Sequence, residues 1–380
     1  MLDRTKIIHK VNTLASTLFK EPLSLAWLNQ SQWQLLVDHP AFIQAVDAKR
    51  HAQQLAYWQG NLGLVTSISD RIEHYTLCAV DGSQIYPDKH LQGLDCFVIN
   101  VAGCCLDYRI ASKAHFFSEP FVYGSDYYAT LGSLFSPDIV DLVREEHEFV
   151  ALAGWAADMV HKAAEAKLVL FDGNLLLWHL ESKPTAIRDL FLNKYLSSLA
   201  ELYQRRIPIA GYLSAPQFHD LASIVRAGLS SVQEILDAPQ IQILHHVLTS
   251  ITDIELLTNV LVPGQRTAVL QSNGAIVARY PDSLKPYFLY LHTGSEIVRL
   301  EIPGWVANDA ILVNQLCALC IDQCEKGFGY PVALAEAHAH AVIKTADRDF
   351  FFQLMQRKAS MTGKHVGLSQ KSLKKKILGF

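Results

Sequence analysis

The sequence predicts an α/β fold built on a mixed sheet with helices on both faces, and three observations lead to this prediction. Apolar residues make up 50% of the 380 residues and charged residues only 18%, so the chain can bury an extensive core. Three consecutive runs between residues 75 and 124 are rich in β-branched and aromatic residues. Two long helical stretches then alternate with two continuous apolar runs, a pattern typical of parallel strands joined by helices.

Residues 1–70 predict an N-terminal helical extension, because their apolar positions recur at helical spacing and only one short β-like run, at 62–69, interrupts them. The charged start MLDRTKIIHK lacks the apolar core of a secretory signal, and no uncharged apolar run approaches the roughly 20 residues that span a bilayer. We therefore expect a cytoplasmic protein with no membrane segment. Its seven cysteines lack the density of a secreted disulfide framework and are expected to be reduced thiols.

Three antiparallel strands are predicted from Tyr75 onward. Gly, Pro, Asp and Asn turn signals separate the runs, and successive strands with short connections pair antiparallel. The three segments are YTLCAVDGS (75–83), LDCFVINVAGCCLDYRI (94–110) and KAHFFSEPFVYG (113–124).

Helices and strands alternate after these runs. Pro137 opens a long helical stretch, and a second helix covers about 185–204. Each helix leads into a continuous apolar run, at 167–173 and 207–214, as expected of buried strands. The order β-β-β-α-β-α-β is that of a ribonuclease H-like core.

The second half predicts additional C-terminal strands and helices, and the strands either extend the first sheet or build a flanking one. Strand-like runs lie at 266–272, 275–280, 287–293 and 296–303, and helical stretches at 218–250, 308–325 and 331–345. Residues 351–380 contain seven basic and no acidic residues, whereas the net charge of the whole chain is −4. Total charge therefore neither supports nor excludes a nucleic-acid partner.

Three cysteines in the predicted helix near 308–325 have the spacing C-x2-C-x3-C. Cys317, Cys320 and Cys324 share one helix face, where cysteine behaves as a small buried apolar residue. The other cysteines lie more than 200 residues away, so a fourth ligand is missing nearby. We interpret the three as core residues rather than as a metal cluster.

Two Asp-Gly dipeptides end the most apolar predicted strands, at Asp81 and Asp172. Either dipeptide alone is a common turn signal, but the matched contexts favour a shared site at one edge of the sheet. Two carboxylates in one site repel each other unless a proton or a divalent cation intervenes. Oxygen ligands of this kind favour Mg²⁺ or Mn²⁺.

A third acidic ligand is expected on the helix that precedes the second Asp-Gly. At 100° per residue Glu145 lies near the centre of the apolar face, while Glu146 and Glu148 lie at its two edges. Either Glu145 or Glu148 can point inward. The alternative for each is a surface glutamate paired near Arg144.

Near the C-terminus, Tyr330 precedes a proline that opens a helix carrying His338 and His340. The two histidines point about 200° apart, so they cannot both bind one metal ion. A single helix histidine is more often structural than catalytic.

Taken together, these motifs resemble those of the NurA family of DNA nucleases. The ordered set covers about residues 75–352, and its most specific member is GYP-x4-EAH. The segments are CAVDGS, KLVLFDGNLL, IPIAGYLSAPQ, TDIELLTNVLVPGQRTAVL, FLYLHTGSEIVRLEIPGW, GYPVALAEAHAHAVI and DRDFF.

The resemblance implies a ribonuclease H-like nuclease core and a set of site residues. Asp81 and Asp172 correspond to the strand carboxylates that hold metal, His338 to the C-terminal ligand, and Tyr330 to a residue lining the site. The usual spacing of the family's helix glutamate falls here on Trp155. The glutamate is therefore assigned to Glu148, with Glu145 as the second choice.

The resemblance also implies the activity and the partners. The protein is expected to be a deoxyribonuclease with single-strand endonuclease and 5′ to 3′ exonuclease activity, dependent on one or two Mn²⁺ or Mg²⁺ ions. A histidine ligand favours Mn²⁺. The expected partners are DNA, single-stranded or at ends, a HerA-like hexameric ATPase in DNA end resection and repair, and a second copy of the chain. The expected regions are the helical extension 1–70, a nuclease domain 71–356 with its core at about 75–215, and a basic tail 357–380.

The alternative is a catalytically inactive DNA-end adaptor or regulator of a ring ATPase. A degenerate site usually lacks a carboxylate, whereas Asp81, Asp172, Tyr330 and His338 are all present, which favours catalysis. A phosphatase for small phosphoesters shares the site chemistry but gives no reason for the large second half.

Overall fold

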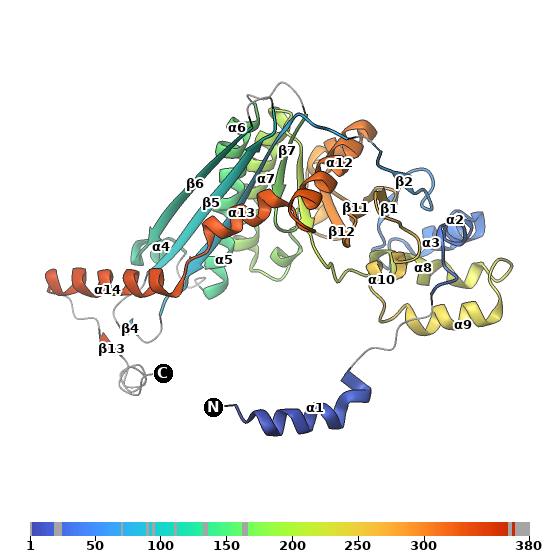
Figure 1. The fold of residues 1–380 in the computed structure, drawn as a ribbon, viewed down its shortest axis with the longest axis horizontal. Helices are drawn as coiled ribbons and strands as arrows, with labels where there is room; N and C mark the ends of the chain where they lie inside the picture. Colours follow the sequence, from blue (N-terminus) through green and yellow to red (C-terminus); the bar gives the residue numbers. More distant parts are fainter. Residues whose placement is uncertain are drawn as a thin grey trace.

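The structure is a computed structural model that describes residues 2–18, 25–69, 71–88, 91–92, 96–109, 112–131, 136–161, 166–363 and 367–368. Its centre is an 11-stranded mixed sheet with helices on both faces (Figure 1). The main path of the sheet runs β1-β10-β11-β12-β8-β7-β3-β5-β6. This arrangement confirms the predicted α/β class.

Five strands form the ribonuclease H-like core, in the order β6-β5-β3-β7-β8. Of these five, β3, β5 and β6 come first in the chain and pair antiparallel, as predicted. The two later strands, β7 and β8, run parallel to β3, also as predicted. Their bounds are β3 (Tyr75–Ile85), β5 (Phe97–Asp107), β6 (Lys113–Tyr123), β7 (Ala166–Phe171) and β8 (Ile209–Leu213).

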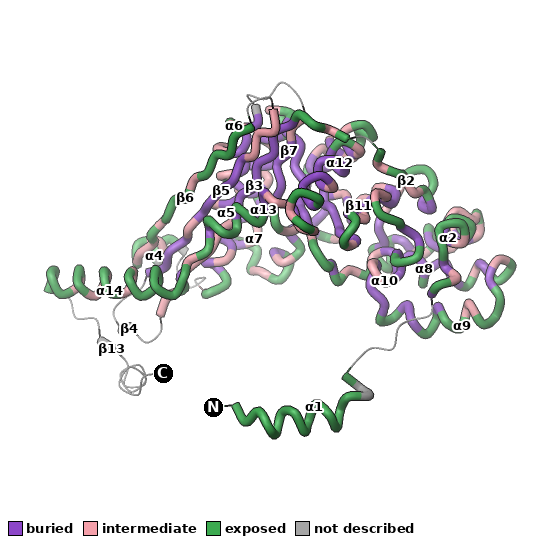
Figure 2. The backbone as a smooth tube through the Cα atoms, viewed as in Figure 1, coloured by how far each residue is buried: buried purple, intermediate pink, exposed green. Residues whose placement is uncertain are grey.

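Helices cover the two faces of this core because side chains alternate along each strand. Cys78 and Val80 of β3 pack on one face beneath α5 and α7, whereas Leu77 and Ala79 pack on the other beneath α12 and α13. Figure 2 shows the buried segments concentrated along β3, β5, β7 and α12. These helices are α5 (Pro137–Ala151), α7 (Thr185–Gln204), α12 (Ala310–Lys326) and α13 (Val332–Ala341).

The helix predicted from Pro137 contains a π-helical turn at Leu152–Ala156 and ends as α6 (Ala157–His161). Trp155 lies in that turn and packs against Phe117 of β6, with ring centroids 4.5 Å apart. The position where the family's glutamate usually falls is thus occupied by a packing residue.

The strands of the second half extend the first sheet rather than build a flanking one. β12 pairs antiparallel with β8, and β11 pairs with β12 over seven residues. The added strands are β9 (Gln265–Arg266), β10 (Leu270–Gln271), β11 (Pro286–His292) and β12 (Ile297–Pro303).

The strand predicted at 275–280 is wrong, because this segment forms a 3-10 turn at Val277–Arg279. The backbone N–H groups of Arg279 and Tyr280 donate to the carbonyl oxygens of Ile276 and Val277, over 3.0 and 3.1 Å, so the segment satisfies its own backbone instead of pairing with a strand. Ile276 and Tyr280 both reach the core beneath α7, and residues four apart share a face in a strand as well as in a helix. The helical stretch predicted at 218–250 forms two separate helices, α8 (Asp220–Gly228) and α9 (Ala238–Val247).

Within residues 2–18 and 25–69, the structure describes three helices and two short strands that join the sheet, β1 to β10 and β2 to β9. Apolar residues between Leu25 and Leu62 share a buried cluster with α8, α9 and α10. The described residues of α1 are exposed, and Figure 1 shows this helix apart from the sheet. The bounds are α1 (Arg4–Leu18), α2 (Gln30–Val37), α3 (Pro40–Lys49), β1 (Tyr57–Trp58), β2 (Thr66–Ser67) and α10 (Asp253–Leu257).

The basic tail predicted at 357–380 begins inside a helix. Residues 357–361 end α14, and β13 pairs with β4. Residues 364–366 and 369–380 of the tail lie outside the described residues.

None of the helices in the described part of the chain is long and apolar enough to cross a membrane. The remaining bounds are β4 (Leu91–Gln92), α4 (Ser125–Leu131), α11 (Gly304–Ala307), α14 (Thr345–Met361) and β13 (Gly367–Leu368).

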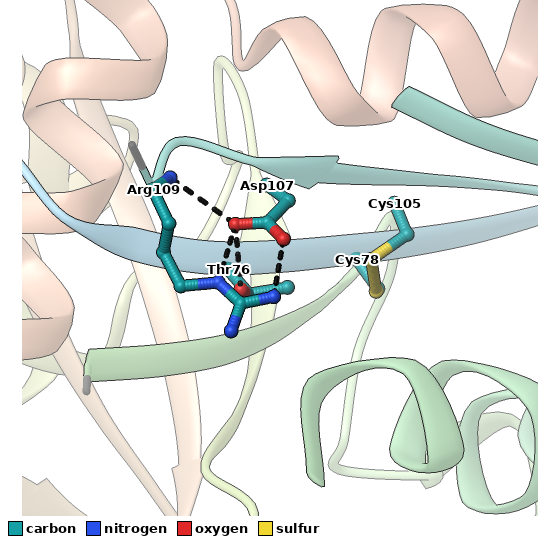
Figure 3. The surroundings of a disulfide bond; sticks show 5 residues. All are labelled: Thr76, Cys78, Cys105, Asp107 and Arg109. Carbon is teal, nitrogen blue, oxygen red and sulfur yellow. Dashed lines mark hydrogen bonds and ion pairs between the residues drawn. A yellow bond between two sulfur atoms is a disulfide. The ribbon is translucent and has the colours of Figure 1, made fainter. Parts of the chain in front are cut away.

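A disulfide joins Cys78 of β3 to Cys105 of β5, which face each other in the antiparallel register (Figure 3). The expectation of reduced thiols is therefore wrong for this pair, because strand pairing places the two side chains together. Cys317, Cys320 and Cys324 of α12 lie fully buried in an apolar cluster. Their interpretation as core residues is confirmed.

Candidate active site

Asp81 and Asp172 take equivalent positions on two neighbouring parallel strands. The last register pair between β3 and β7 joins Val80 to Phe171, so each aspartate comes directly after this pair. β7 ends there, whereas β3 continues to Ile85 by pairing with β5, so Asp81 lies within its strand rather than at the predicted end. Parallel register brings the two side chains to one edge of β7.

His338 and Tyr330 reach these two carboxylates from α13 and the turn before it. Nδ1 of His338 lies 2.7 Å from Oδ2 of Asp81, and the Tyr330 hydroxyl donates to Oδ2 of Asp172 over 2.9 Å. His340 instead packs against Phe116 of β6 in a tilted arrangement, with ring centroids 4.5 Å apart. The two histidines of α13 thus have separate surroundings, as their spacing predicts.

Glu148 of α5 lies against β3 at the glycine that follows Asp81. Its side chain is 2% exposed, and a Cβ atom at Gly82 would be only 2.5 Å from Glu148 Oε1. The glycine of the first Asp-Gly dipeptide therefore opens space for the glutamate as well as ending the apolar run. Glu148 also forms an ion pair with Arg144, one helical turn away.

Burial sets the protonation behaviour of Glu148. Burial raises the pKa of this carboxyl to about 8, Arg144 opposes the shift, and the charge of Asp81 adds to it. Partial desolvation also raises the pKa of Asp172; the Tyr330 hydrogen bond opposes this and Asp81 adds to it. These mutual effects mark one region of concentrated negative charge.

The two other glutamates of α5 have different partners. Glu145 accepts a hydrogen bond from His179 over 2.9 Å, and Glu146 pairs with Lys194 at 2.7 Å. Glu148 is thus the glutamate of this helix that lies against the strand carrying Asp81.

Among the residues that the structure describes, no three His, Cys, Asp or Glu side chains form a group that could hold a metal ion as they stand. Each acidic group has another partner in the structure: Glu148 has Arg144, Asp172 has Tyr330, and Asp81 has His338. The donor chemistry fits Mn²⁺ or Mg²⁺, because the four candidates are three carboxylates and one imidazole and the charge of Asp81 acts on both Glu148 and Asp172.

Sequence reasoning missed part of the electrostatic role of Arg144. Four nearby carboxylates raise the pKa of its guanidinium, and burial opposes them. These carboxylates belong to Glu148, Glu145, Asp81 and Asp141. The Nε atom of Arg144 is buried without a hydrogen-bond partner. The spacing of four residues between Arg144 and Glu148 is the sequence signal that could have identified the pair.

The strand order and the paired carboxylates define a ribonuclease H-like α/β protein with an acidic site at the edge of its parallel strands. The sequence matches the NurA domain family over residues 75–343, so the chain belongs to the NurA family. The resemblance inferred from the ordered motifs is thereby confirmed. A comparison of the sequence with curated proteins found no match.

The solved structures that are similar to this chain include several of NurA proteins. The crystal structure of the NurA nuclease from Sulfolobus solfataricus has a TM-score of 0.52 at 14% sequence identity, covers 95% of this chain and 98% of its own, and shares its fold. A crystal structure of NurA with manganese has a TM-score of 0.38 at 13% identity, with 93% and 98% of the two chains covered. A structure of NurA bound to dAMP and manganese has a TM-score of 0.35 at 12% identity, with 91% and 95% covered.

Proposed function

We propose that this protein is a divalent-metal-dependent deoxyribonuclease with single-strand endonuclease and 5′ to 3′ exonuclease activity. The observation that carries the proposal is the placement of Asp81 and Asp172 directly after the last pair of two parallel strands. Membership of the NurA family supports it. The proposed catalytic residues are Asp81, Glu148, Asp172, Tyr330 and His338.

The proposed ligands are Asp81, Glu148, Asp172 and His338, for one or two Mn²⁺ or Mg²⁺ ions. When bound, such an ion lowers the pKa of a coordinated water and neutralises charge on a phosphodiester. The residues of the chain orient the site: the Tyr330 hydroxyl fixes Oδ2 of Asp172, and His338 faces Oδ2 of Asp81. Metal ligands must be deprotonated, so Glu148 releases any proton it holds when it becomes a ligand.

DNA cleavage by purified protein tests this proposal. We expect a 5′-labelled single strand to be cut in the presence of Mn²⁺ and to remain intact with EDTA. Asp81→Ala and Asp172→Ala should each lower the rate at least about 100-fold, because a lost ligand removes the activated water. Circular dichroism and thermal unfolding establish that both variants are folded. Cutting at the wild-type rate by either folded variant would contradict the site.

Two further substrates separate the alternatives. Hydrolysis of p-nitrophenyl phosphate at a rate above that of DNA cleavage would identify a small-phosphoester phosphatase. Binding to DNA ends with no metal-dependent cleavage would identify an adaptor.

The partners belong to the same proposal. The sequence contains no phosphate-binding loop for ATP, so a HerA-like hexameric ATPase would supply translocation in DNA end resection and repair, and the nuclease would act as a homodimer in the cytoplasm. Co-elution with a HerA-type ATPase in size-exclusion chromatography, and ATP-stimulated cutting by the mixture, test this. Absence of both would refute the partnership and leave the nuclease proposal intact.

A further inference from the structure

The loop that follows Asp172 is held by a buried carboxylate from another strand. Oε2 of Glu301, on β12, accepts hydrogen bonds from the backbone N–H groups of Leu175 and Leu176, each over 2.9 Å. Glu301 is fully buried, at 0% exposure. One carboxylate oxygen thus accepts hydrogen bonds from two successive backbone amides, which lie three and four residues beyond Asp172 and outside the strands.

Strand register explains how Glu301 reaches this loop. Phe171 of β7 pairs with Gly211 of β8, and Gly211 pairs with Glu301 of β12, so the three residues form one row across the sheet. A Cβ atom at Gly211 would lie 2.4 Å from the carbonyl oxygen of Gly173. The glycine therefore leaves the space in which the loop turns back over β8 toward Glu301.

Arg299, two residues earlier on β12, holds Glu301 in place. Its Nε donates to Oε1 of Glu301 over 3.0 Å, and its Nη1 donates to Asp220 over 2.6 Å. The guanidinium carbon lies 3.9 Å from the ring centre of Phe218 and 3.8 Å from that of Phe288. Burial raises the pKa of Glu301, and the charge of Arg299 and the hydrogen bonds from the amides of Leu175 and Leu176 oppose that shift.

A second side chain, that of Tyr280, also holds this loop. The Tyr280 hydroxyl donates to the carbonyl oxygen of Leu175 and accepts from the N–H of Leu177, both over 3.0 Å. Three consecutive amides therefore have side-chain acceptors. Buried ion pairs add little stability compared with apolar residues of similar size, so stability alone does not account for a charged pair at this position.

We propose that Glu301 is a positioning residue of the active site: held by Arg299, it fixes the loop after β7 and thereby the carboxylate of Asp172. The inference rests on the proposed function, in which Asp172 is a metal ligand. Ligands need to be placed to within about 0.5 Å, and partners that orient them typically change metal affinity roughly 10- to 100-fold when removed.

Two charge-free double variants isolate the role of the acceptor oxygen. Arg299→Met/Glu301→Gln keeps a carbonyl oxygen for the two loop amides, whereas Arg299→Met/Glu301→Met has none. Both remove the charges of Arg299 and Glu301, have similar volume and leave Asp220 without Arg299, so the loss of that contact is the same in the two variants. Thermal unfolding establishes that both are folded. We expect the first variant to bind Mn²⁺ close to wild-type affinity and the second to bind it roughly 10- to 100-fold more weakly.

Mn²⁺ binding is measured without DNA, from the loss of the electron paramagnetic resonance signal of free Mn²⁺ during titration. Leu244→Ala, in the buried cluster of α9, is the control for general loss of stability, and its Mn²⁺ affinity should equal that of the wild type. In the cleavage assay at saturating Mn²⁺, the second double variant should recover most of its kcat, with an unchanged KM for DNA.

The outcomes separate this inference from the proposed function. Equal Mn²⁺ affinities in the two double variants would overturn the positioning role of Glu301, as would an equal loss in Leu244→Ala. Asp172→Ala is the reference: equal affinity in this variant and the wild type would refute the proposed metal ligand. Weak binding by Asp172→Ala, together with equal affinities in both double variants, would refute the positioning role alone.

Discussion

Replacement of Glu148 by glutamine tests the electrostatics of the site without metal. The pKa of Glu148 is raised from 4.5 to about 8 in the folded protein, so the unfolded chain ionises first as pH rises. Each pKa unit corresponds to about 1.4 kcal/mol, so the shift predicts a loss of about 5 kcal/mol of stability once the buried group is fully ionised. The loss begins near pH 4.5 and is complete above about pH 8.

Glutamine keeps a carbonyl oxygen for Arg144 and carries no charge. We therefore expect Glu148→Gln to become more stable than the wild type as pH rises from 5 to 9 in EDTA, by an amount of the order of a few kcal/mol at pH 8. Urea unfolding at a series of pH values measures the difference. Glu146→Gln is the matched control on the same helix, because Glu146 pairs with Lys194 and is not among the charges that shift the pKa of Glu148.

The direction in which stability changes with pH is the most specific part of this prediction. A group with a raised pKa contributes stability at low pH that is lost as pH rises through its folded value. Parallel stability curves for Glu148→Gln and the wild type between pH 5 and 9 would refute the reasoning. Mn²⁺ should raise the melting temperature of the wild type more than that of Glu148→Gln, because the variant lacks one of the proposed ligands.

Three other predictions follow from the same geometry. Asp172→Asn should raise the melting temperature in EDTA, because it removes the repulsion between Asp172 and Asp81; a lower melting temperature would contradict the shared charge. Gly82→Ala should cost about 1–3 kcal/mol in urea unfolding and lower the cleavage rate, because its Cβ would lie 2.5 Å from Glu148 Oε1; an unchanged rate and stability would contradict this packing. Glu145→Gln should retain far more nuclease activity than Glu148→Gln in the same assay, and the reverse order would assign the helix ligand to Glu145.

Local patterns were sufficient to predict most of the core. Enrichment in β-branched and aromatic residues, together with turn signals, located β3, β5 and β6, and the helix expected at about 185–204 coincides with α7. These elements are predictable because residue preference and turn residues are local properties of the chain. The run at 275–280 was misjudged because a short apolar segment is compatible with either a strand or a turn of helix, and the hydrogen bonds within its own backbone decide between them.

The candidate site was predictable only in part. The Asp-Gly dipeptides marked Asp81 and Asp172, because a carboxylate after an apolar run is a local signal. Helical periodicity left both Glu145 and Glu148 open, since each lies on or beside the apolar face of α5. The choice depends on where α5 crosses β3, and that crossing places Glu148 against the glycine after Asp81.

Local patterns in the chain were therefore enough to predict the α/β class, the order of the core elements and two aspartates of the candidate site. The folded arrangement was needed to find that the second-half strands join the first sheet, that Cys78 pairs with Cys105 and that Glu301 contacts the loop amides. The physical reason is that burial imposes a periodic pattern on neighbouring residues. Contacts between distant segments depend on strand register and helix crossing, which leave no such pattern in the chain.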